Sequence, residues 1–270
     1  MTRRLLLLYF FLSCAMALGQ EDLKLISWNI RDFGKSKDTV ELEQIAEIVR
    51  DADILALQEV VAGYGGAQAV AQLADLLNRK GSKWDYLISN PTESPKYATE
   101  RYAFLWKTHK IKIRNRGTLL KKLEKVVDRE PYLMEFYVEE RLITLLNFHS
   151  RPFNKNPEAE IRAITQYVLQ HLKTPLILAG DFNVDEADKV FDVLKSAGKF
   201  PAITNKKTTL KRICEGNYYL NYAIDNIFYS QEIKKRESGV IDFVEKCENL
   251  LQARKLSDHL PVYLNFSLNK

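Results

Sequence analysis

Seven polar residues that could bind a metal ion or move a proton each lie at or just beyond the end of a predicted β-strand. They are three acidic residues, two asparagines and two histidines: Asn29, Glu59, His149, Asp181, Asn183, Asp225 and His259. Carboxylate and amide oxygens bind hard cations, and a histidine paired with a carboxylate can transfer a proton. Two histidines among so many oxygens do not make a zinc cage. The set therefore predicts magnesium-assisted hydrolysis of a phosphodiester.

The strand that precedes Asp181 has the clearest pattern in the chain. Residues 176–179 form an unbroken apolar run between Pro175 and Gly180. A run of this length is typical of a central strand that is covered on both faces, and ligands collect beyond the ends of such strands. An ordinary turn explains Asp181 and Asn183 equally well when this stretch is taken alone. The functional interpretation therefore depends on the other strand ends.

Alternating apolar residues predict the strands that position the rest of the set. These predicted strands cover residues 22–28, 54–57, 86–88, 103–106, 133–138 and 142–148, and the last two form a hairpin around Glu139 and Glu140. Apolar residues at helical spacing predict helices within 42–49, 70–77, 161–168 and 190–197. A layered sheet brings its strand ends to one edge, so we expect the seven residues to meet in one cleft.

The first residues have the layout of a cleaved signal peptide. Two arginines and an apolar run occupy residues 3–12, and small residues follow as far as Gly19. The apolar run is too short to span a membrane. We therefore expect a signal peptide at 1–19, one α/β domain at 20–270, and a secreted or periplasmic protein without stable membrane insertion. A lipoprotein anchored through Cys14 is a minor alternative.

Charge and cysteine content add two weaker expectations. Removal of residues 1–19 takes two of the 40 basic residues and none of the 35 acidic ones, which leaves 38 against 35, or +3. This mild bias favours polyanions without naming a partner.

Cys214 and Cys247 are the two cysteines that remain after this cleavage. An even pair favours a disulfide in an oxidising compartment, with two buried free thiols as the alternative. The basic run at 206–212 could contact phosphates but is more typical of a solvated loop.

Eight short blocks in a fixed order give the chain a family resemblance. The blocks lie at residues 27–31, 58–60, 100–102, 129–131, 149–150, 180–183, 224–225 and 257–259. Together they resemble the endonuclease/exonuclease/phosphatase superfamily, and within it the deoxyribonuclease I branch most. Each block is weak alone, but eight in order from Leu23 onwards are a strong signal. The resemblance implies a four-layered α/β sandwich of two packed mixed β-sheets flanked by helices.

The resemblance also implies roles for individual side chains. A Mg²⁺ ion, with Mn²⁺ or Ca²⁺ as additional candidates, would be held by Asn29, Glu59 and Asp258. The catalytic group would comprise Glu100, His149, Asp181, Asn183, Asp225 and His259, with Glu100 behind His149 and Asp225 behind His259. Such a carboxylate fixes the histidine tautomer and raises its basicity. Substrate phosphates would be contacted by Arg31 and Arg129.

The implied function is a secreted, monomeric endonuclease that cleaves DNA with little sequence preference and needs no protein partner. Val61 stands where deoxyribonuclease I has an arginine, and Ala98, beside Tyr97, stands where it has a stacking tyrosine. Its disulfide positions are not reproduced either, so groove contacts and calcium dependence stay open. The alternative is a sphingomyelinase-like phosphodiesterase acting on phospholipid head groups. That activity uses an exposed apolar hairpin, and the sequence offers only the charged Glu139–Glu140 turn.

Overall fold

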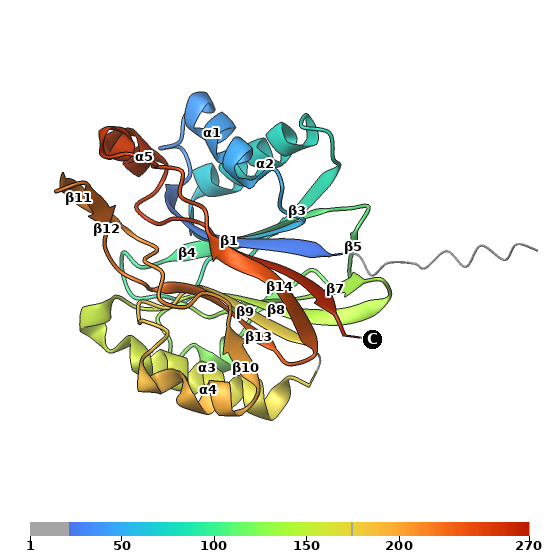
Figure 1. Cartoon of the computed structure of the whole chain (residues 1–270). Helices are drawn as coiled ribbons and strands as arrows, with labels where there is room; N and C mark the ends of the chain where they lie inside the picture. Colours follow the sequence, from blue (N-terminus) through green and yellow to red (C-terminus); the bar gives the residue numbers. More distant parts are fainter. Residues whose placement is uncertain (1–21, 174, 270) are drawn as a thin grey trace, which may run out of the picture.

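Two large β-sheets pack face to face in the computed structural model, which describes residues 22–173 and 175–269 (Figure 1). The first sheet has the order β14 (Ile233–Val240), β15 (Val262–Leu268), β1 (Leu23–Phe33), β2 (Ile54–Val61), β4 (Glu100–Lys107) and β3 (Trp84–Ile88). The second has the order β10 (Lys199–Pro201), β13 (Asp225–Ser230), β9 (Leu176–Asp181), β8 (Arg141–His149), β7 (Tyr132–Val138) and β5 (Ile111–Ile113), and β6 (Thr118–Leu119) also pairs with β7.

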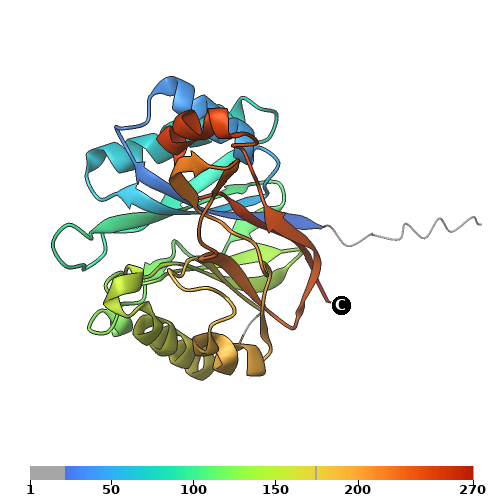
Figure 2. The same cartoon turned by 60° about the vertical axis from the view of Figure 1, so that its left-hand side comes forward.

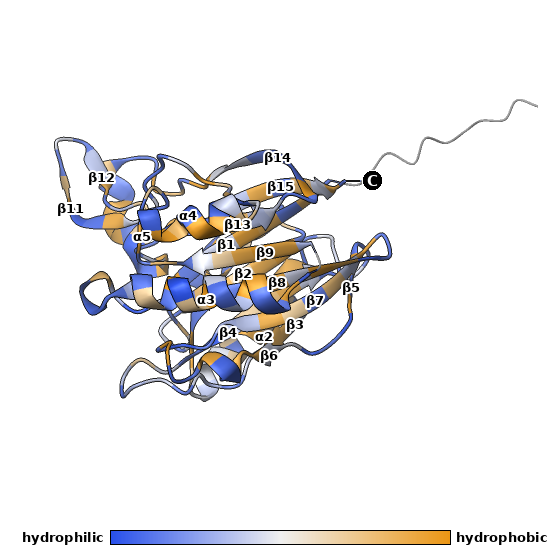
Figure 3. Ribbon diagram, turned by 90° about the horizontal axis from the view of Figure 1, so that it is seen from below, coloured by the Kyte–Doolittle hydropathy of each residue, from blue (hydrophilic) through white to orange (hydrophobic). Residues whose placement is uncertain are grey.

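Helices cover the outer face of each sheet (Figures 1 and 2). The first sheet carries α1 (Thr39–Val49), α2 (Tyr64–Asn78) and α5 (Leu250–Leu256), and the second carries α3 (Pro157–His171) and α4 (Asp192–Ser196). One buried apolar cluster fills the space between the sheets, and a second and third fill the spaces between each sheet and its helices. Figure 3 shows these apolar residues concentrated along the strands. The predicted four-layered α/β sandwich is confirmed.

Strand register brings site residues from distant parts of the chain together. β8 and β9 are parallel, with His149 opposite Asp181 at their ends. β9 and β13 are antiparallel, with Asp181 opposite Asp225. In the first sheet, β1 and β2 are parallel, with Asn29 opposite the residue before Glu59. The ends of these strands therefore form one polar edge shared by both sheets.

β1 and β2 extend further than the sequence pattern predicted. β1 continues to Phe33 and β2 to Val61, and the register shifts between Asn29 and Phe33 and again between Leu57 and Val60. An irregularity of this kind inserts a residue and turns a side chain out of the regular alternation. Glu59 lies in this stretch with a positive φ of 57°. The alternation ended at the bulges, so the sequence prediction ended the strands there too.

Two helices differ in their bounds from the sequence pattern. Tyr64 to Gly66 form the first turn of α2, which therefore begins before the predicted stretch 70–77. A Cβ atom on Gly66 would lie 2.0 Å from the Val61 carbonyl oxygen, so glycine is needed for the helix to begin this close to β2. The helix expected at 190–197 is a 3₁₀ turn, Lys189–Phe191, followed by the short helix α4.

A two-stranded hairpin, β11 (Leu210–Glu215) and β12 (Tyr218–Leu220), projects from the sandwich (Figures 1 and 3). The expectation of a solvated loop at 206–212 holds for the exposed Lys206 and Lys207 but is wrong from Thr208 to Leu210, which are buried. The sequence analysis found no exposed apolar hairpin and only the charged Glu139–Glu140 turn, whereas in the structure Ile213 on β11 is an exposed apolar residue.

The predicted Cys214–Cys247 disulfide is present, with 5.7 Å between the Cα atoms. It links β11 to the 3₁₀ turn Cys247–Asn249. The predicted signal peptide and Cys14 lie outside the described residues. Among the residues that are described, no helix is both long and apolar enough to cross a membrane.

Candidate active site

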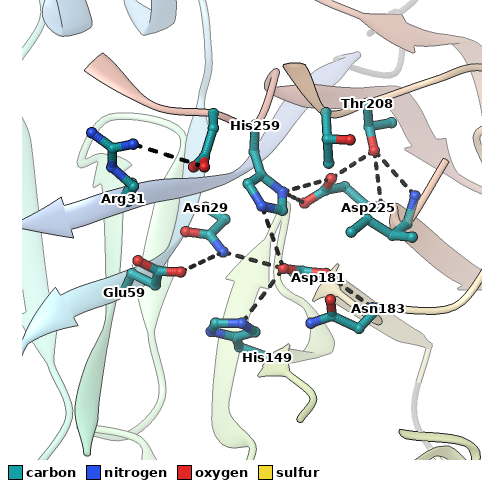
Figure 4. Close-up of polar contacts among 12 residues, drawn as sticks. Asn29, Arg31, Glu59, His149, Asp181, Asn183, Thr208, Asp225 and His259 are labelled. Atoms are coloured by element: carbon teal, nitrogen blue, oxygen red, sulfur yellow. Dashed lines mark hydrogen bonds and ion pairs between the residues drawn. The ribbon is translucent and has the colours of Figure 1, made fainter. Parts of the chain in front are cut away.

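The Asp181 carboxylate is the centre of the polar edge (Figure 4). Its Oδ2 atom accepts a hydrogen bond from Asn29 Nδ2 at 3.2 Å. The same oxygen lies 3.5 Å from His149 Nε2 and 3.8 Å from His259 Nε2. Burial and the nearby Asp225 carboxylate raise the pKa of Asp181, although His259 acts against this rise. One buried carboxylate oxygen is therefore faced by two imidazoles and an amide from three separate elements.

Glu100 orients His149. The Nδ1 atom of His149 lies 2.9 Å from Glu100 Oε2 and 3.1 Å from Oε1, which leaves Nε2 directed at Asp181. Burial lowers the pKa of His149, but the Glu100 carboxylate outweighs burial and the net direction is upward. Burial raises the pKa of Glu100, and His149 reverses that effect so that the net direction is downward. Both shifts favour an ion pair of imidazolium and carboxylate.

Asp225 orients His259 in the same way. His259 Nδ1 lies 3.0 Å from Asp225 Oδ2 and 3.1 Å from Oδ1. Ser257 Oγ accepts from the His259 backbone N–H and donates to the Asn29 carbonyl, which fixes this segment against β1. Burial lowers the pKa of His259, but the Asp225 and Asp181 carboxylates raise it to about 10. His259 is therefore a cation at neutral pH.

Thr208 is a site residue that the sequence analysis missed. Its Oγ1 donates to Asp225 Oδ2 at 2.6 Å. Thr208 therefore positions the Asp225 carboxylate, which in turn orients His259. The backbone N–H of Asp225 in turn donates to Thr208 Oγ1 at 3.1 Å. Thr208 lies in the basic run that was interpreted as a solvated loop, and only the apolar Leu210 two positions later signalled that the run becomes buried.

Replacing Thr208 with valine should lower kcat by about 10-fold to 100-fold and leave KM nearly unchanged. Valine keeps the shape but removes a hydrogen bond to a charged group, which contributes about 1.5 to 3 kcal/mol. Rates at saturating substrate measured across pH should also show a shifted profile, because Asp225 loses its donor. Thr208→Ser keeps the hydroxyl and should retain most of the activity. Equal losses in the serine and valine variants would contradict this positioning role.

Stability should depend on pH through His259. The pKa of His259 in the folded protein, about 10, lies above its ordinary value of 6.5, so the native state holds a proton that the unfolded chain releases. The resulting stabilisation is complete below pH 6.5 and is lost as the pH rises towards 10. The test is urea unfolding in the presence of a chelator at several pH values between 6.5 and 10. The free energy of unfolding should fall more steeply with rising pH in the wild-type protein than in His259→Gln. Parallel curves would contradict the assignment.

Glu59 and Asn29 provide oxygens suited to a hard cation. Asn29 Nδ2 donates to Glu59 Oε1 at 3.1 Å and to Asp181 Oδ2 at 3.2 Å, so both carboxylate contacts of this side chain are made by its amide nitrogen. The amide oxygen Oδ1 is buried and has no hydrogen-bond partner in the described part of the chain. A backbone N–H from Asp32 holds the second Glu59 oxygen at 3.2 Å. An oriented carboxylate beside an unpartnered amide oxygen fits Mg²⁺, and Mn²⁺ or Ca²⁺ as well.

A second group could in principle hold a metal. Asp181, Asp225 and His259 each offer one atom, and these atoms lie within 4.8 Å of one another. However, His259 Nδ1 is engaged with Asp225, and because the pKa of His259 is raised, a metal would have to displace a proton from the ring. This group is therefore better suited to proton transfer than to metal binding.

Asn183 lies beside Asp181 because the chain turns sharply there. Its backbone N–H donates to Asp181 Oδ1 at 2.9 Å, its side chain donates to the Ser150 carbonyl at 3.2 Å, and its φ is 52°. Gly180 has a φ of 147°, and a Cβ atom there would lie 1.7 Å from the Phe148 carbonyl oxygen. Only glycine lets β9 approach β8 at this point, which places Asp181 and Asn183 at the strand end.

The two predicted phosphate-binding arginines lie in different environments. Arg31 is partly exposed, and its Nη1 lies 3.8 Å from Asp258 Oδ2. Arg129 is buried, and its Nε lies 3.0 Å from Glu100 Oε2 while Nη1 donates to the Ser150 carbonyl at 3.0 Å. Arg129 therefore supports the Glu100–His149 pair in this structure. Arg31 can still turn towards a substrate.

Asp258 was predicted to bind the metal together with Glu59 and Asn29. In the structure its Oδ2 atom lies between two guanidinium groups, 3.4 Å from Arg254 Nη2 and 3.8 Å from Arg31 Nη1. The structure thus brings Asn29 and Glu59 into direct contact with each other and pairs Asp258 with arginines at the margin of the cluster.

Fold and site together define a class: a layered α/β protein in which two histidine–carboxylate pairs lie beside oxygen donors suited to a hard cation. A model of the endonuclease/exonuclease/phosphatase family matches residues 26–259. The chain belongs to this family.

Known proteins with related sequences or folds agree with this assignment. The chain is 25% identical over 278 residues to deoxyribonuclease gamma of Rattus norvegicus, covering 95% of this chain and 87% of that protein. An endonuclease/exonuclease/phosphatase family protein from Bacteroides thetaiotaomicron shares the fold with a TM-score of 0.68 at 17% identity, covering 93% of this chain and 99% of the other. A mannosyl-6-phosphatase from the same organism gives a TM-score of 0.64 at 18% identity, covering 91% and 100%. These two structures show the shared fold alone.

Proposed function

We propose that this protein is an exported endonuclease that requires a divalent cation and cleaves DNA with little sequence preference. The observation that carries the proposal is the Asp181 carboxylate, which faces the Nε2 atoms of two histidines, each backed by its own carboxylate. Such a pair can supply both proton transfers of phosphodiester hydrolysis at one phosphate. The signal-peptide pattern and the disulfide support export.

Each residue has a part in the proposed reaction. Asp181 accepts a hydrogen bond from the attacking water and orients it, while Asn183 binds a phosphoryl oxygen. A new bond forms between this water oxygen and phosphorus as the bond to the leaving oxygen breaks. His259, which is a cation at neutral pH, protonates the leaving oxygen, and the neutral form of His149 accepts the proton of the water. A cation bound at Glu59 and Asn29 would stabilise negative charge on the phosphoryl oxygens.

DNA is favoured as the substrate by similarity and by surface chemistry. The similarity to deoxyribonuclease gamma, weak as it is at 25% identity, spans nearly the whole chain. Near Glu100, Tyr97 is 93% exposed, with Lys96 Nζ 5.0 Å from its ring centre, and could stack against a base. Arg31 supplies a partly exposed cation for the backbone phosphates.

The deciding experiment uses protein beginning at Gln20 with four substrates: supercoiled plasmid, RNA, sphingomyelin vesicles and mannose 6-phosphate. Each is incubated with Mg²⁺ or with EDTA. We expect the plasmid to be relaxed and then fragmented with Mg²⁺ and to stay intact in EDTA, since a closed circle can be opened only by internal cleavage. Release of phosphate or of phosphocholine without plasmid cleavage would overturn the proposal and identify a phosphatase or a phospholipid-cleaving enzyme.

A further inference from the structure

The β11–β12 hairpin begins directly at the active site. We define residues 206–222, which comprise this hairpin and its two flanks, as the arm. Thr209 forms a β-bridge with His259. The Leu210 N–H donates to the Asp258 carbonyl at 2.8 Å, and the Leu260 N–H donates to the Thr208 carbonyl at 2.7 Å. The base of the arm is therefore hydrogen-bonded to the segment that carries a catalytic histidine.

The arm is held in place from three sides. The Cys214–Cys247 disulfide links β11 to the 3₁₀ turn before α5. Arg254 of α5 donates from Nη1 to the Leu210 carbonyl at 2.8 Å and to the Lys211 carbonyl at 3.1 Å. A separate apolar cluster lies beneath the arm and comprises Leu210, Val244, Leu250, Ala253 and Leu260. A hairpin this well fixed can present its outer side chains in one defined arrangement.

Those outer side chains are basic and aromatic. Ile213, Tyr218 and Tyr222 are 72%, 74% and 62% exposed. The arm contains four basic residues, Lys206, Lys207, Lys211 and Arg212, and one acidic residue, so its formal net charge is +3. The acidic residue, Glu215, pairs with Lys211 at 2.9 Å. The exposed cations that precede Ile213 can thus meet an anionic ligand.

We propose that the arm binds a nucleic-acid strand beyond the scissile phosphate, with Lys206, Lys207 and Arg212 on backbone phosphates and Tyr218 and Tyr222 stacked on bases. The proposal rests on the function proposed above. Basic residues interleaved with exposed aromatic rings are the combination that binds single-stranded or unpaired nucleic acid without sequence preference. The arm would therefore determine which substrates bind well, and not how fast a bound phosphodiester is cleaved.

The chemistry of the hairpin tip favours nucleic acid over a lipid surface. The tip is Glu215-Gly216-Asn217, which is polar and carries a negative charge. A hairpin that inserts into a membrane interface needs apolar residues at its tip. Ile213 is set back from this tip on β11. An inserted arm would bury Glu215 before Ile213 reached the acyl chains.

The test compares Lys206→Ala/Lys207→Ala and Tyr218→Ala with a matched control, Lys234→Ala/Lys235→Ala. The control removes the same charge from two exposed lysines on β14, at the opposite edge of the first sheet from β3. Anisotropy with a labelled single strand of about 20 nucleotides in EDTA measures binding at several salt concentrations. Plasmid cleavage gives kcat and KM, and bis(4-nitrophenyl) phosphate reports on the catalytic site with a substrate too small to reach the arm. Thermal unfolding confirms that the variants fold.

We expect the lysine variant to reduce the slope of log affinity against log salt by roughly 0.7 for each phosphate that the arm no longer neutralises. Tyr218→Ala should weaken strand binding by about 5-fold to 150-fold, the equivalent of one stacked base. Both variants should raise KM for plasmid, while kcat and the rate with the small diester stay at the control value.

Equal strand affinity and salt slope in the arm variants and the control would overturn the arm proposal, whatever the wild-type protein cleaves. Failure of the wild-type protein to cleave plasmid would overturn the proposed function instead, and the anisotropy would still decide on the arm. A lipid-binding role is tested by sedimentation of the protein with phosphatidylcholine–phosphatidylserine vesicles. If the wild-type protein sediments with the vesicles, and Ile213→Ser/Tyr218→Ser does not but still binds the strand normally, the arm binds lipid and the proposal is contradicted.

Discussion

Replacing His149 or His259 with alanine should lower kcat for plasmid cleavage by roughly 100-fold to 10,000-fold in each case. Each ring presents Nε2 to the Asp181 carboxylate while a carboxylate holds its Nδ1, so each proton transfer depends on one positioned ring. KM should change little, because neither ring supplies most of the contacts with an extended substrate. Initial rates at saturating plasmid and Mg²⁺ measure the effect.

The double variant sharpens this test. Two residues that act on one phosphate form a unit, so the loss in His149→Ala/His259→Ala should be far smaller than the product of the single losses. His171→Ala is the control, because this histidine lies in the last turn of α3 and stacks on Tyr167, outside the catalytic cluster. Losses that multiply cleanly, or normal turnover in either single variant, would show that the paired mechanism does not operate.

Glu59→Gln should raise the Mg²⁺ concentration needed for half-maximal activity by at least about 10-fold, since it removes a charged oxygen ligand with little change in size. Activity should recover partly at high Mg²⁺, because Asn29 still offers its amide oxygen. Calorimetric titration of Mg²⁺ into the protein without substrate should show the same loss of affinity, independently of catalysis.

Glu43→Gln is the matched control for Glu59→Gln. Glu43 is an exposed carboxylate on α1, so its replacement changes the net charge equally and should leave the Mg²⁺ titration unchanged. If both variants titrated like the wild-type protein, the metal would have to be assigned to other residues, and the Asp181–Asp225–His259 group would be the next to test.

Local patterns in the sequence predicted the strands and the polar residues at their ends, whereas the four-layered arrangement of the two sheets was implied by the family resemblance. The apolar run before Gly180 and the alternation around Asn147 determine which residues are buried, and register then places His149 and Asp181 side by side. The pairing of each histidine with its carboxylate came from the family resemblance. Nothing local to His259 indicates Asp225, which lies 34 residues earlier in the chain.

The features that were missed depend on contacts that a local pattern does not encode. Thr208 lies among lysines, and its importance arises only because Asp225 folds back against it. The bulge at Glu59 interrupts the alternation that would have signalled a longer strand. Arg129 has the charge expected for phosphate binding, but its burial beside Glu100 could be seen only once β4 and β8 were placed together.

The path of the chain through the two sheets has a consequence for when activity can first appear. Asn29 and Glu59 come from the first sheet and Asp181 and Asp225 from the second, but His259 precedes β15, which returns to pair with β1 in the first sheet. A ribosome must therefore synthesise the chain past β13 and α5 before the proposed catalytic group can be complete. A nascent fragment that already contains both central strands lacks His259, so the proposed mechanism predicts that it cannot cleave a phosphodiester during most of its own synthesis.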